Sequence, residues 1–326
     1  MMLLTSYKIL TIAADKGGKF TPFVEEQVDA LVTMGTEVLR YPHRAHGILN
    51  YIKEILHIRK AIRKECPNVI HAHFGLTGLA ATLAAIGLRI PVVITYHGCD
   101  INDAKIRPFS QFAMRLADWN IFVSYQQMIN AFGDENKAKK NSKWCILPCG
   151  VNIDTFDHSN VNEEWFNENF EPKKYVLFAG SFDSTVKNSI LAKQAIEVYN
   201  NNHLEAPLEL LELRGYTRDE VVTLMYKCDT LLLTSIREGS PQVVKEAMAC
   251  GCPIVSVDVG DVKERLAGLE GCYVAESRTP EELAELLELS VSFSRTKGRE
   301  QLIDAGLDNV QIAEKLLSIY TKLINK

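Results

Sequence analysis

Short runs of β-branched and other apolar residues alternate with amphipathic stretches along the whole chain. In the first half, apolar runs that predict buried strands occupy residues 7–13, 36–40, 68–72, 91–96, 120–124 and 144–148. Between them, apolar residues recur at helical spacing in stretches such as 25–34, 51–64 and 109–117. A strand–helix alternation of this kind predicts a parallel, doubly wound sheet.

The alternation stops at a polar segment, about residues 157–172, and then starts again. This segment carries repeated Asn and Glu, which marks it as a linker. Beyond it, strands are predicted at residues 175–179, 208–213, 230–234, 253–257 and 272–274, and helices at 189–200, 218–227, 241–250 and 281–289. We therefore predict one Rossmann-like domain over residues 1–160, a linker over 161–172 and a second Rossmann-like domain over 173–308.

The last predicted element is a helix with one apolar face over residues 309–326. The face consists of Ala313, Leu316, Leu317, Tyr320, Leu323 and Ile324. Such a stripe has to be buried against another element. Because ligands of open α/β sheets bind at the carboxyl ends of the strands, we expect the two domains to face a central cleft.

Composition narrows the class of protein. Hydrophobic residues make up 47% and charged residues 24% of the 326 residues, as in a globular protein with well-formed cores. The net charge of −5 argues against a nucleic-acid partner. The eight cysteines lack the C-x-x-C spacing of a zinc site, so we expect them to be reduced and no metal to be bound.

The sequence shows no targeting or membrane-spanning signal. The start MMLLTSYKIL lacks the charged leader and long apolar segment of a signal peptide. No stretch reaches the roughly 18 consecutive apolar residues that a spanning helix needs. We therefore expect a cytoplasmic protein.

The densest group of chemistry-bearing residues follows the predicted strand at 230–234. Pro241 suits the first turn of a helix, and Glu238, Gly239 and Ser240 lie in the loop directly before it. A helix N-terminus offers N–H donors and a partial positive charge, which predicts a phosphate site at this loop. The complete run reads Thr234-Ser-Ile-Arg-Glu-Gly-Ser-Pro-Gln-Val-Val-Lys-Glu-Ala-Met-Ala-Cys-Gly-Cys-Pro.

Two glutamates eight positions apart, followed by Ala-Met-Ala-Cys-Gly-x-Pro, resemble the signature of family 4 retaining glycosyltransferases of the GT-B fold. The resemblance implies that Glu238 lies beside the transferred sugar and that Glu246 accepts hydrogen bonds from the ribose hydroxyls of a nucleotide. It also implies that the helix at 309–326 packs back on the N-terminal domain. For the glutamate pair alone, an ordinary strand–loop–helix with two solvated side chains is the alternative interpretation.

Segments of the first half agree with this resemblance in order and position. Gly17 and Gly18 follow the first strand and resemble the family's glycine-rich loop near the donor phosphates. They lack the G-x-G-x-x-G spacing of a dinucleotide site, which argues against a dehydrogenase. His97, in Thr-Tyr-His-Gly-Cys-Asp, matches the histidine that contacts the donor sugar near its reacting carbon. His71 and His73 are expected to be packing residues at a strand end.

The second domain departs from the family at one position. The family usually has Gly-Arg after the first strand and a lysine several residues later, and both cations hold the diphosphate. Here Lys187 matches the lysine, but Ser181 stands where the arginine would be, which weakens the expected phosphate clamp. Arg214-Gly-Tyr-Thr resembles the loop that meets the nucleotide base and makes Tyr216 a donor-binding candidate.

The chemistry of the expected reaction needs fixed positive potential at the leaving diphosphate. Lys187 and the helix that starts at Pro241 are candidates to supply it, and no Asp-x-Asp metal motif occurs in the sequence. The resemblance implies retention of anomeric configuration. We therefore expect a retaining, metal-independent hexosyltransferase without a cofactor, whose catalytic candidates are Glu238, His97 and Lys187. The donor-binding candidates are Glu246, Gly17, Gly18, Gly239, Ser240, Pro241, Tyr216 and Ser181.

The expected partners are a nucleotide-sugar donor and a saccharide or lipid-linked acceptor, as in glycan, polysaccharide or glycolipid biosynthesis. Basic residues crowd the predicted helix at 51–64 and the loop at 137–143. A solvated face and peripheral contact with an anionic inner membrane surface both stay open for them. The alternative functions are a sugar-nucleotide epimerase, a phosphorylase and a non-catalytic nucleotide-sugar-binding protein, the last of which Ser181 favours.

Overall fold

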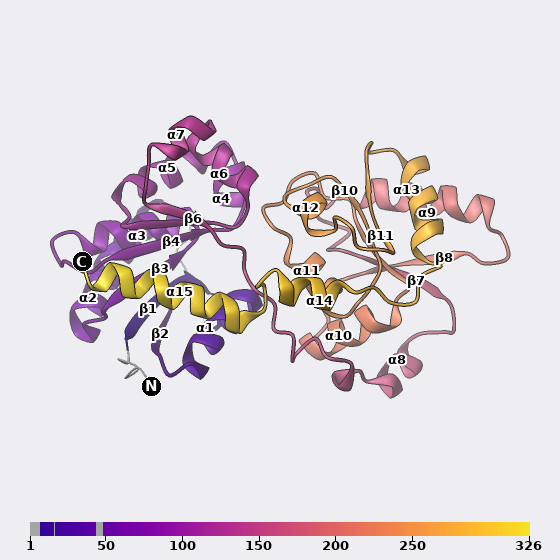
Figure 1. Ribbon diagram of the computed structural model, residues 1–326, viewed down its shortest axis with the longest axis horizontal. Coiled ribbons are helices and arrows are strands. Elements are labelled where there is room, and N and C mark those ends of the chain that lie inside the picture. Colours follow the sequence, from indigo (N-terminus) through magenta and orange to yellow (C-terminus); the bar gives the residue numbers. More distant parts are fainter. Residues whose placement is uncertain (1–6, 16, 44–47) are drawn as a thin grey trace. The chain divides into compact units, whose positions relative to one another are not determined.

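The computed structural model describes residues 7–15, 17–43 and 48–326 of the chain (Figure 1). The chain divides into two compact units. The N-terminal unit comprises Met1–Gly150 together with Asn309–Lys326, and the C-terminal unit comprises Val151–Asp308. Both units are α/β, as the strand–helix alternation predicts.

The N-terminal unit contains a six-stranded sheet of order β2-β1-β3-β4-β5-β6, in which all pairs are parallel. Its strands are β1 (Lys8–Ala14), β2 (Glu37–His43), β3 (Val69–His73), β4 (Val92–Tyr96), β5 (Trp119–Phe122) and β6 (Trp144–Ile146). Its helices are α1 (Pro22–Thr33), α2 (Ile48–Glu65), α3 (Gly75–Ala85), α4 (Cys99–Asn102), α5 (Arg107–Leu116), α6 (Tyr125–Phe132), α7 (Glu135–Lys139) and α15 (Asn309–Ile324).

The direction of the crossovers decides which helices share a face of this sheet. The chain moves one way from β1 to β2 and the opposite way from β2 through β3 and β4 to β5. Right-handed crossovers therefore place α2, α3 and α5 on one face and α1 on the other. The helix pairs α2–α3 and α3–α5 pack together on the first face, and α15 packs against α1.

The C-terminal unit contains a five-stranded parallel sheet of order β11-β10-β9-β7-β8. Its strands are β7 (Lys174–Phe178), β8 (Leu208–Glu212), β9 (Thr230–Leu233), β10 (Ile254–Val257) and β11 (Cys272–Ala275). A 3₁₀ turn at His158–Asn160 precedes the helices α8 (Glu163–Asn169), α9 (Ser189–Asn202), α10 (Arg218–Lys227), α11 (Gln242–Ala249), α12 (Val262–Arg265), α13 (Pro280–Ser290) and α14 (Gly298–Asp304).

The central strands are buried on both faces, because helices cover both sides of a parallel sheet. Every residue of β3, β4, β9 and β10 is buried. His71 and His73 lie inside β3 and are therefore core residues. Within the described residues, no helix is both long enough and apolar enough to cross a lipid bilayer.

The predicted linker at residues 161–172 does not match the structure. The unit boundary falls earlier, between Gly150 and Val151, and the segment contains helix α8, which Asn162 caps by accepting a hydrogen bond from the Trp165 N–H. The ring of Phe170 packs against that of Tyr175 with 5.7 Å between centroids. Aromatic residues scattered among Asn and Glu thus attach this polar segment to the C-terminal unit.

Helix α15 completes the core of the N-terminal unit, although it lies far away in the sequence. Its buried residues include Ile312, Leu316 and Tyr320. The Tyr320 hydroxyl is 2.6 Å from Nδ1 of His71 in β3, and both side chains are buried. The apolar stripe that the sequence shows along this helix is therefore used for packing within the N-terminal unit.

Candidate active site

Two loops meet at the carboxyl ends of the neighbouring strands β7 and β9. The loop after β9 begins with Thr234, whose hydroxyl donates to the main-chain carbonyls of Lys187 (2.9 Å) and Asn188 (3.0 Å) in the loop after β7. Thr234 is fully buried, so these bonds are protected from water. These two bonds therefore fix the position of one loop relative to the other without the help of a ligand.

The first consequence is that Lys187 and Glu238 form an ion pair. The Lys187 Nζ lies 2.7 Å from Oε1 of Glu238, and both side chains are mostly buried. The stem of Lys187 passes over Gly180, where an added Cβ would lie 2.7 Å from the Lys187 Cγ. A residue without a side chain is therefore needed at position 180. Two of the three predicted catalytic residues are in direct contact.

Glu246 forms a second ion pair on the adjoining helix α11. Its Oε1 lies 2.8 Å from the guanidinium of Arg218, and the carboxylate is almost fully buried. The Arg218 guanidinium also stacks over the Phe156 ring, 4.4 Å from the centroid. Arg218 was not among the residues predicted from the sequence; it stands at the first position of α10, directly after the Gly-Tyr-Thr loop.

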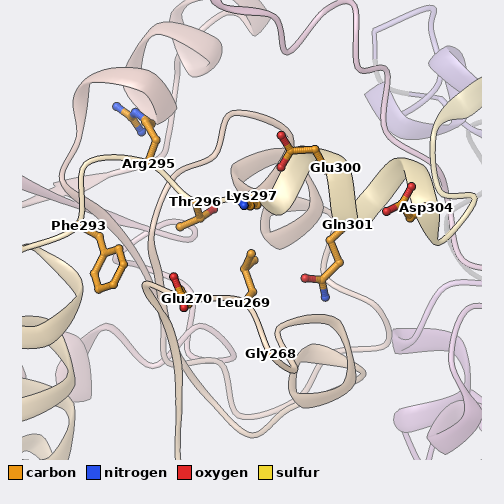
Figure 2. A pocket seen from close by; sticks show the side chains of 10 residues that line it. All are labelled: Gly268, Leu269, Glu270, Phe293, Arg295, Thr296, Lys297, Glu300, Gln301 and Asp304. Atoms are coloured by element: carbon orange, nitrogen blue, oxygen red, sulfur yellow. The ribbon is translucent and has the colours of Figure 1, made fainter.

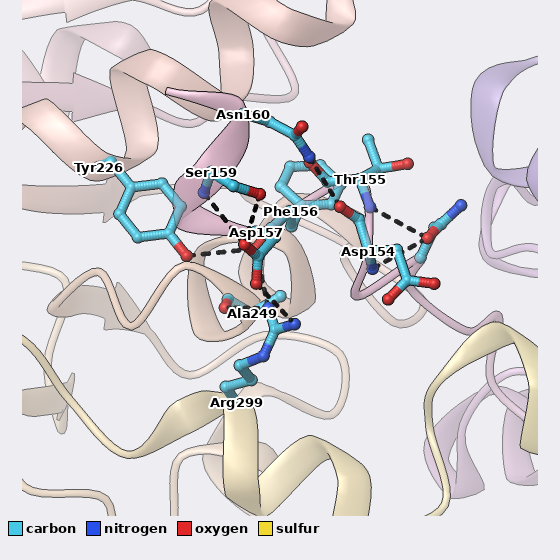
Figure 3. Close-up of polar contacts among 10 residues, drawn as sticks. Asp154, Thr155, Phe156, Asp157, Ser159, Asn160, Tyr226, Ala249 and Arg299 are labelled. Atoms are coloured by element: carbon cyan, nitrogen blue, oxygen red, sulfur yellow. Dashed lines mark hydrogen bonds and ion pairs between the residues drawn. The ribbon is translucent and has the colours of Figure 1, made fainter. Parts of the chain in front are cut away.

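The main chain at Phe156 is itself held in place by hydrogen bonds. The Tyr226 hydroxyl donates to its carbonyl (3.3 Å), and so does Arg299 (2.9 Å). Arg299 also pairs with the carboxylate of Asp157 at 3.2 Å. Figure 3 shows these side chains converging on the segment. Phe156 is therefore a fixed platform, which in turn fixes Arg218 and the carboxylate of Glu246.

The loop before α11 is held in place by the segment that follows β10. Ser240 donates a hydrogen bond from its hydroxyl to the buried carboxylate of Asp261 (2.8 Å), and Arg265 pairs with the same carboxylate (2.9 Å). Gly260 packs closely on this loop, because an added Cβ would lie 2.8 Å from the Gly239 carbonyl oxygen. The Ser240 side chain thus holds the loop in the described structure.

Pro241 shapes the helix start and donates no hydrogen bond there. It is the N-cap of α11 with φ of −64°, so the helix begins at Gln242, one residue later than predicted. Proline has no N–H group. Pro241 therefore sets the direction of the chain at the helix start and offers no N–H donor to a ligand.

Arg214 places a guanidinium beside Ser181, the position at which the family resemblance implies an arginine. The Arg214 guanidinium lies 3.4 Å from the Ser181 hydroxyl and forms an ion pair with Asp183. Arg214 is exposed at the end of β8. The ring of Tyr216, two residues on, packs edge-on against Trp165 with 6.0 Å between centroids.

In the N-terminal unit, His97 lies at the carboxyl end of β4 among other rings. Its Nε2 is 2.9 Å from Nδ1 of His73, and its Nδ1 is 3.5 Å from the Cys149 thiol. The rings of Phe23 and Phe74 lie 5.1 Å and 4.5 Å from its ring centroid. These contacts fix the orientation of the His97 ring.

Burial keeps the neighbouring histidines neutral. It lowers the pKa of His71 to about 3, and it holds the pKa of His73 well below its ordinary value, with the nearby rings of His71 and His97 acting in the same direction. Both imidazoles therefore lack charge near neutral pH. The expectation that they are packing residues agrees with their burial inside β3.

Asp100 holds the His97 loop and was missed by the sequence analysis. Its buried carboxylate accepts hydrogen bonds from the main-chain N–H groups of Gly75 (3.1 Å), His97 (3.1 Å) and Gly98 (2.9 Å). It thereby joins the loops that follow β3 and β4. Burial raises its pKa to about 6, against the effect of these hydrogen bonds. An acidic residue three positions after His97 was the available signal.

Gly17 and Gly18 lie in the exposed loop after β1. Both have positive φ, 75° and 93°, a conformation that favours glycine. The N–H of Gly18 donates to the carboxylate of Asp15. The loop belongs to the N-terminal unit, whereas the Lys187, Glu238 and Glu246 cluster belongs to the C-terminal unit.

A pocket of about 750 Å³ lies elsewhere in the C-terminal unit (Figure 2). None of the predicted site residues lines it. Arg295 at its edge donates to the Met225 carbonyl (3.1 Å) and stacks on Tyr226, so it holds the fold together. Among the residues the structure describes, no group of three or more His, Cys, Asp or Glu side chains is arranged to hold a metal ion.

Two doubly wound units with charged side chains gathered at their strand ends are the architecture of a GT-B glycosyltransferase. Residues 11–155 match the family Glycosyltransferase Family 4, and residues 192–289 match the family Glycosyl transferases group 1. The chain therefore belongs to the family 4, group 1 glycosyltransferases. The predicted fold class and family are confirmed.

Relatives and a solved structure agree with this family. An uncharacterized glycosyltransferase of Methanocaldococcus jannaschii is 29% identical, over 71% of this chain and 68% of the relative. The N,N'-diacetylbacillosaminyl-diphospho-undecaprenol alpha-1,3-N-acetylgalactosaminyltransferase of Campylobacter jejuni is 27% identical, over 98% of this chain and 95% of the relative. The structure of Anabaena HepE in complex with UDP is similar in fold, with a TM-score of 0.70 at 16% identity over 97% of this chain and 100% of that chain.

Proposed function

We propose that this glycosyltransferase moves a hexose from a nucleotide-diphosphate sugar to a saccharide or lipid-linked acceptor, with retention of anomeric configuration and without a metal ion. The observation that carries the proposal is the Lys187–Glu238 pair, 2.7 Å apart, beside the helix that bears Glu246. It brings a cation for phosphate and a carboxylate for the sugar to one place. The two glutamates are therefore not solvated surface residues.

The leaving diphosphate is proposed to bind between Lys187, the start of α11 and Arg214. A diphosphate gains negative charge as the sugar–phosphate bond breaks, and fixed cations stabilise that charge. Arg214 lies 3.4 Å from the Ser181 hydroxyl. It therefore supplies, from a neighbouring strand end, the positive charge that serine at position 181 lacks.

Glu246 is proposed to bind the ribose hydroxyls of the donor. Its Oε1 is engaged by Arg218 at 2.8 Å, and a carboxylate has a second oxygen that accepts hydrogen bonds. Arg218, which stacks on Phe156, holds the carboxylate in one orientation before the donor binds. Preorganisation of this kind improves affinity because less side-chain motion is lost on binding.

The proposed reaction balances without an added base. The bond between the anomeric carbon and the diphosphate oxygen breaks, and a bond from that carbon to the acceptor oxygen forms on the same face. The proton of the acceptor hydroxyl passes to the departing phosphate oxygen. Glu238 stabilises the positive charge that develops on the sugar, and His97 is proposed to contact the same sugar.

Relatives support the choice of substrates. The Campylobacter jejuni relative is named for a diphospho-undecaprenol substrate, and HepE has been solved with UDP and with UDP-glucose. We therefore propose a uridine or other nucleoside diphosphate sugar as donor and a lipid-linked saccharide as acceptor.

A ligand screen followed by product analysis tests this function. Thermal unfolding of the chain should shift upward with one class of nucleotide sugar, because ligand binding stabilises the folded state. The product formed with that donor, analysed by NMR, should keep the anomeric configuration, and transfer should continue in EDTA. An inverted product, an epimerised donor without transfer, or activity that returns only with added magnesium or manganese would each contradict the corresponding part of the proposal.

A further inference from the structure

Helix α3 packs unusually close to the sheet and to α5, because its inward face consists of small residues. A Cβ added at Gly75 would overlap Ser110 of α5, and one added at Gly78 would lie 2.6 Å from Ile94 of β4. The larger residues Leu76, Leu79 and Leu83 follow at helical spacing and are half-buried, with Leu79 packed against the core. Ile86, directly after the helix, is exposed.

Helix α5 adds an exposed apolar stripe next to it. Phe109, Phe112 and Leu116 are 47%, 49% and 39% exposed and lie at positions i, i+3 and i+7. The opposite side of α5 is buried through Ser110 and Ala113. Two exposed phenylalanines and a leucine on a single helix form an apolar patch. On a protein surface in contact with water, such a patch marks an interaction site.

The end of α2 flanks the other side of α3. Arg59 donates to the main-chain carbonyls of Ala84 (2.7 Å) and Ile86 (2.8 Å), so α2 lies against the C-terminal end of α3. Ile86 is 59% exposed there, and Leu56 on α2 is 66% exposed. The exposed apolar residues of α2, of α5 and of the C-terminal end of α3 are Leu56, Phe109, Phe112, Leu116 and Ile86, and we name them the α2–α3–α5 face.

Exposed cations lie close in sequence to these apolar residues, on α2 and α5 and just after α3. They are Lys53, Lys60, Arg63, Arg89 and Arg115. Helices α3 and α5 contain no Asp or Glu, and residues 48–117 hold nine Lys and Arg against four Asp and Glu, in a chain whose net charge is −5. Of these four acids, Asp100 is buried, and Glu65 is paired with Lys64 and Lys8. The face therefore combines exposed apolar residues with an excess of positive charge, and we call these five cations its rim.

The second basic segment that the sequence analysis considered is less positive than its composition suggests. Lys137 pairs with Asp134 at 3.3 Å, and Lys139 pairs with Glu135 at 2.7 Å. Half of the lysines in the 137–143 loop are thus compensated by carboxylates on the same short helix. The α2–α3–α5 face has no such compensation within α3 and α5.

We infer that the α2–α3–α5 face docks on an anionic lipid bilayer. A bilayer surface accepts this pattern, because aromatic and aliphatic side chains enter the boundary between headgroups and acyl chains while Lys and Arg stay at the lipid phosphates. The inference goes beyond the proposed function, for which it would bring the enzyme to a lipid-linked acceptor. The two are separable, because membrane binding is measured without catalysis.

Vesicle sedimentation tests the inference with the full chain and no substrate. The chain should bind vesicles of phosphatidylcholine mixed with phosphatidylglycerol and should bind pure phosphatidylcholine much less. Phe109→Ser with Phe112→Ser should weaken binding at least about tenfold, through the lost apolar burial. The matched control, Leu204→Ser with Leu289→Ser in the C-terminal unit, removes two exposed leucines and should bind as the parent does.

A charge variant tests the rim separately. Lys60→Gln with Arg63→Gln should weaken binding to anionic vesicles about thirtyfold, with a smaller loss at high salt. Lys263→Gln with Lys297→Gln removes two cations of the C-terminal unit and should have little effect. Unchanged thermal unfolding of each variant shows that the fold is intact, and the charge variant keeps the test decisive if the serine variant fails to fold.

Three results would overturn the inference. The first is equal binding to neutral and anionic vesicles, and the second is binding that persists in both face variants. The third is a chain that ignores vesicles but forms dimers that the Phe109 and Phe112 substitutions dissociate, which would make this face a contact between two copies. Transfer to a water-soluble acceptor should stay at the parental rate in the face variants, so a failure of catalysis is distinguishable from a failure of docking.

Discussion

Replacing Glu238 with glutamine removes a negative charge that lies 2.7 Å from the Nζ of Lys187. In the unliganded protein this carboxylate neutralises part of the positive charge that the diphosphate would use. A partly buried ion pair of this kind is worth about 1 kcal/mol. Freed from it, Lys187 should bind a nucleoside diphosphate about fivefold more tightly.

The same substitution should slow the reaction. Glu238 is proposed to act on charge that appears only as the sugar–phosphate bond breaks, so its loss should lower kcat, by about a hundredfold if its contribution resembles that of other transition-state electrostatic groups. The test is calorimetry with the nucleoside diphosphate together with initial rates for Glu238→Gln. Glu264→Gln, which changes an exposed glutamate of the same unit, serves as the control and should alter neither quantity.

Glu246 provides the contrast within the same site. Glu246→Gln removes a contact to ribose that is present both before and during the reaction, so it should weaken diphosphate binding and raise the donor KM, with a smaller change in kcat. Weaker diphosphate binding in Glu238→Gln, or equal effects of the two substitutions, would refute the division of roles. No effect from either would remove the main argument for the site.

Three further predictions concern stability and the lysine site. Because burial lowers the pKa of His71 to about 3, the folded state binds fewer protons than the unfolded state below pH 6.5, and stability should fall by about 2 kcal/mol from this group by pH 5. His71→Asn should remove that part of the pH dependence in urea unfolding, while Asp100, whose raised pKa acts with the opposite sign, contributes equally to both proteins. Tyr320→Phe removes a buried hydroxyl 2.6 Å from His71 and should cost about 1–3 kcal/mol in the same assay; no loss would show that the hydroxyl is not needed there. Gly180→Ala would place a Cβ 2.7 Å from the Lys187 stem, so calorimetry should show weaker diphosphate binding, and parental affinity would contradict the proposed path of that lysine.

Much of the fold follows from patterns that are local in the sequence. Strands such as β4 and β7 are continuous apolar runs, because helices cover both faces of a parallel sheet. The positions of Glu238 and Glu246 around the start of a helix likewise follow from the order of a strand, a loop and a proline. The stripe along α15 is visible as a repeat of apolar residues every three or four positions.

Contacts between distant segments could not be predicted in this way. Arg218 on α10 pairs with Glu246 on α11. Nothing in the sequence around either residue indicates that the other is its partner. Asp100 is a buried carboxylate whose partners are main-chain N–H groups from two loops, and main-chain groups have no sequence signature. Helix α8 was missed because its polar composition favours a linker, whereas its stability comes from aromatic contacts with residues further along the chain.

The order in which the chain is synthesised gives α15 a special place. The N-terminal unit takes its first 150 residues from the start of the chain, but the helix that carries Tyr320 emerges only after the whole C-terminal unit. At about 5–20 residues per second, this delay lasts roughly 8–30 s. During that time the core around His71 lacks its contact with Tyr320 of α15. The C-terminal unit is a single continuous segment, so it can fold as soon as it leaves the ribosome. The unit that is made first is therefore the one that finishes folding last.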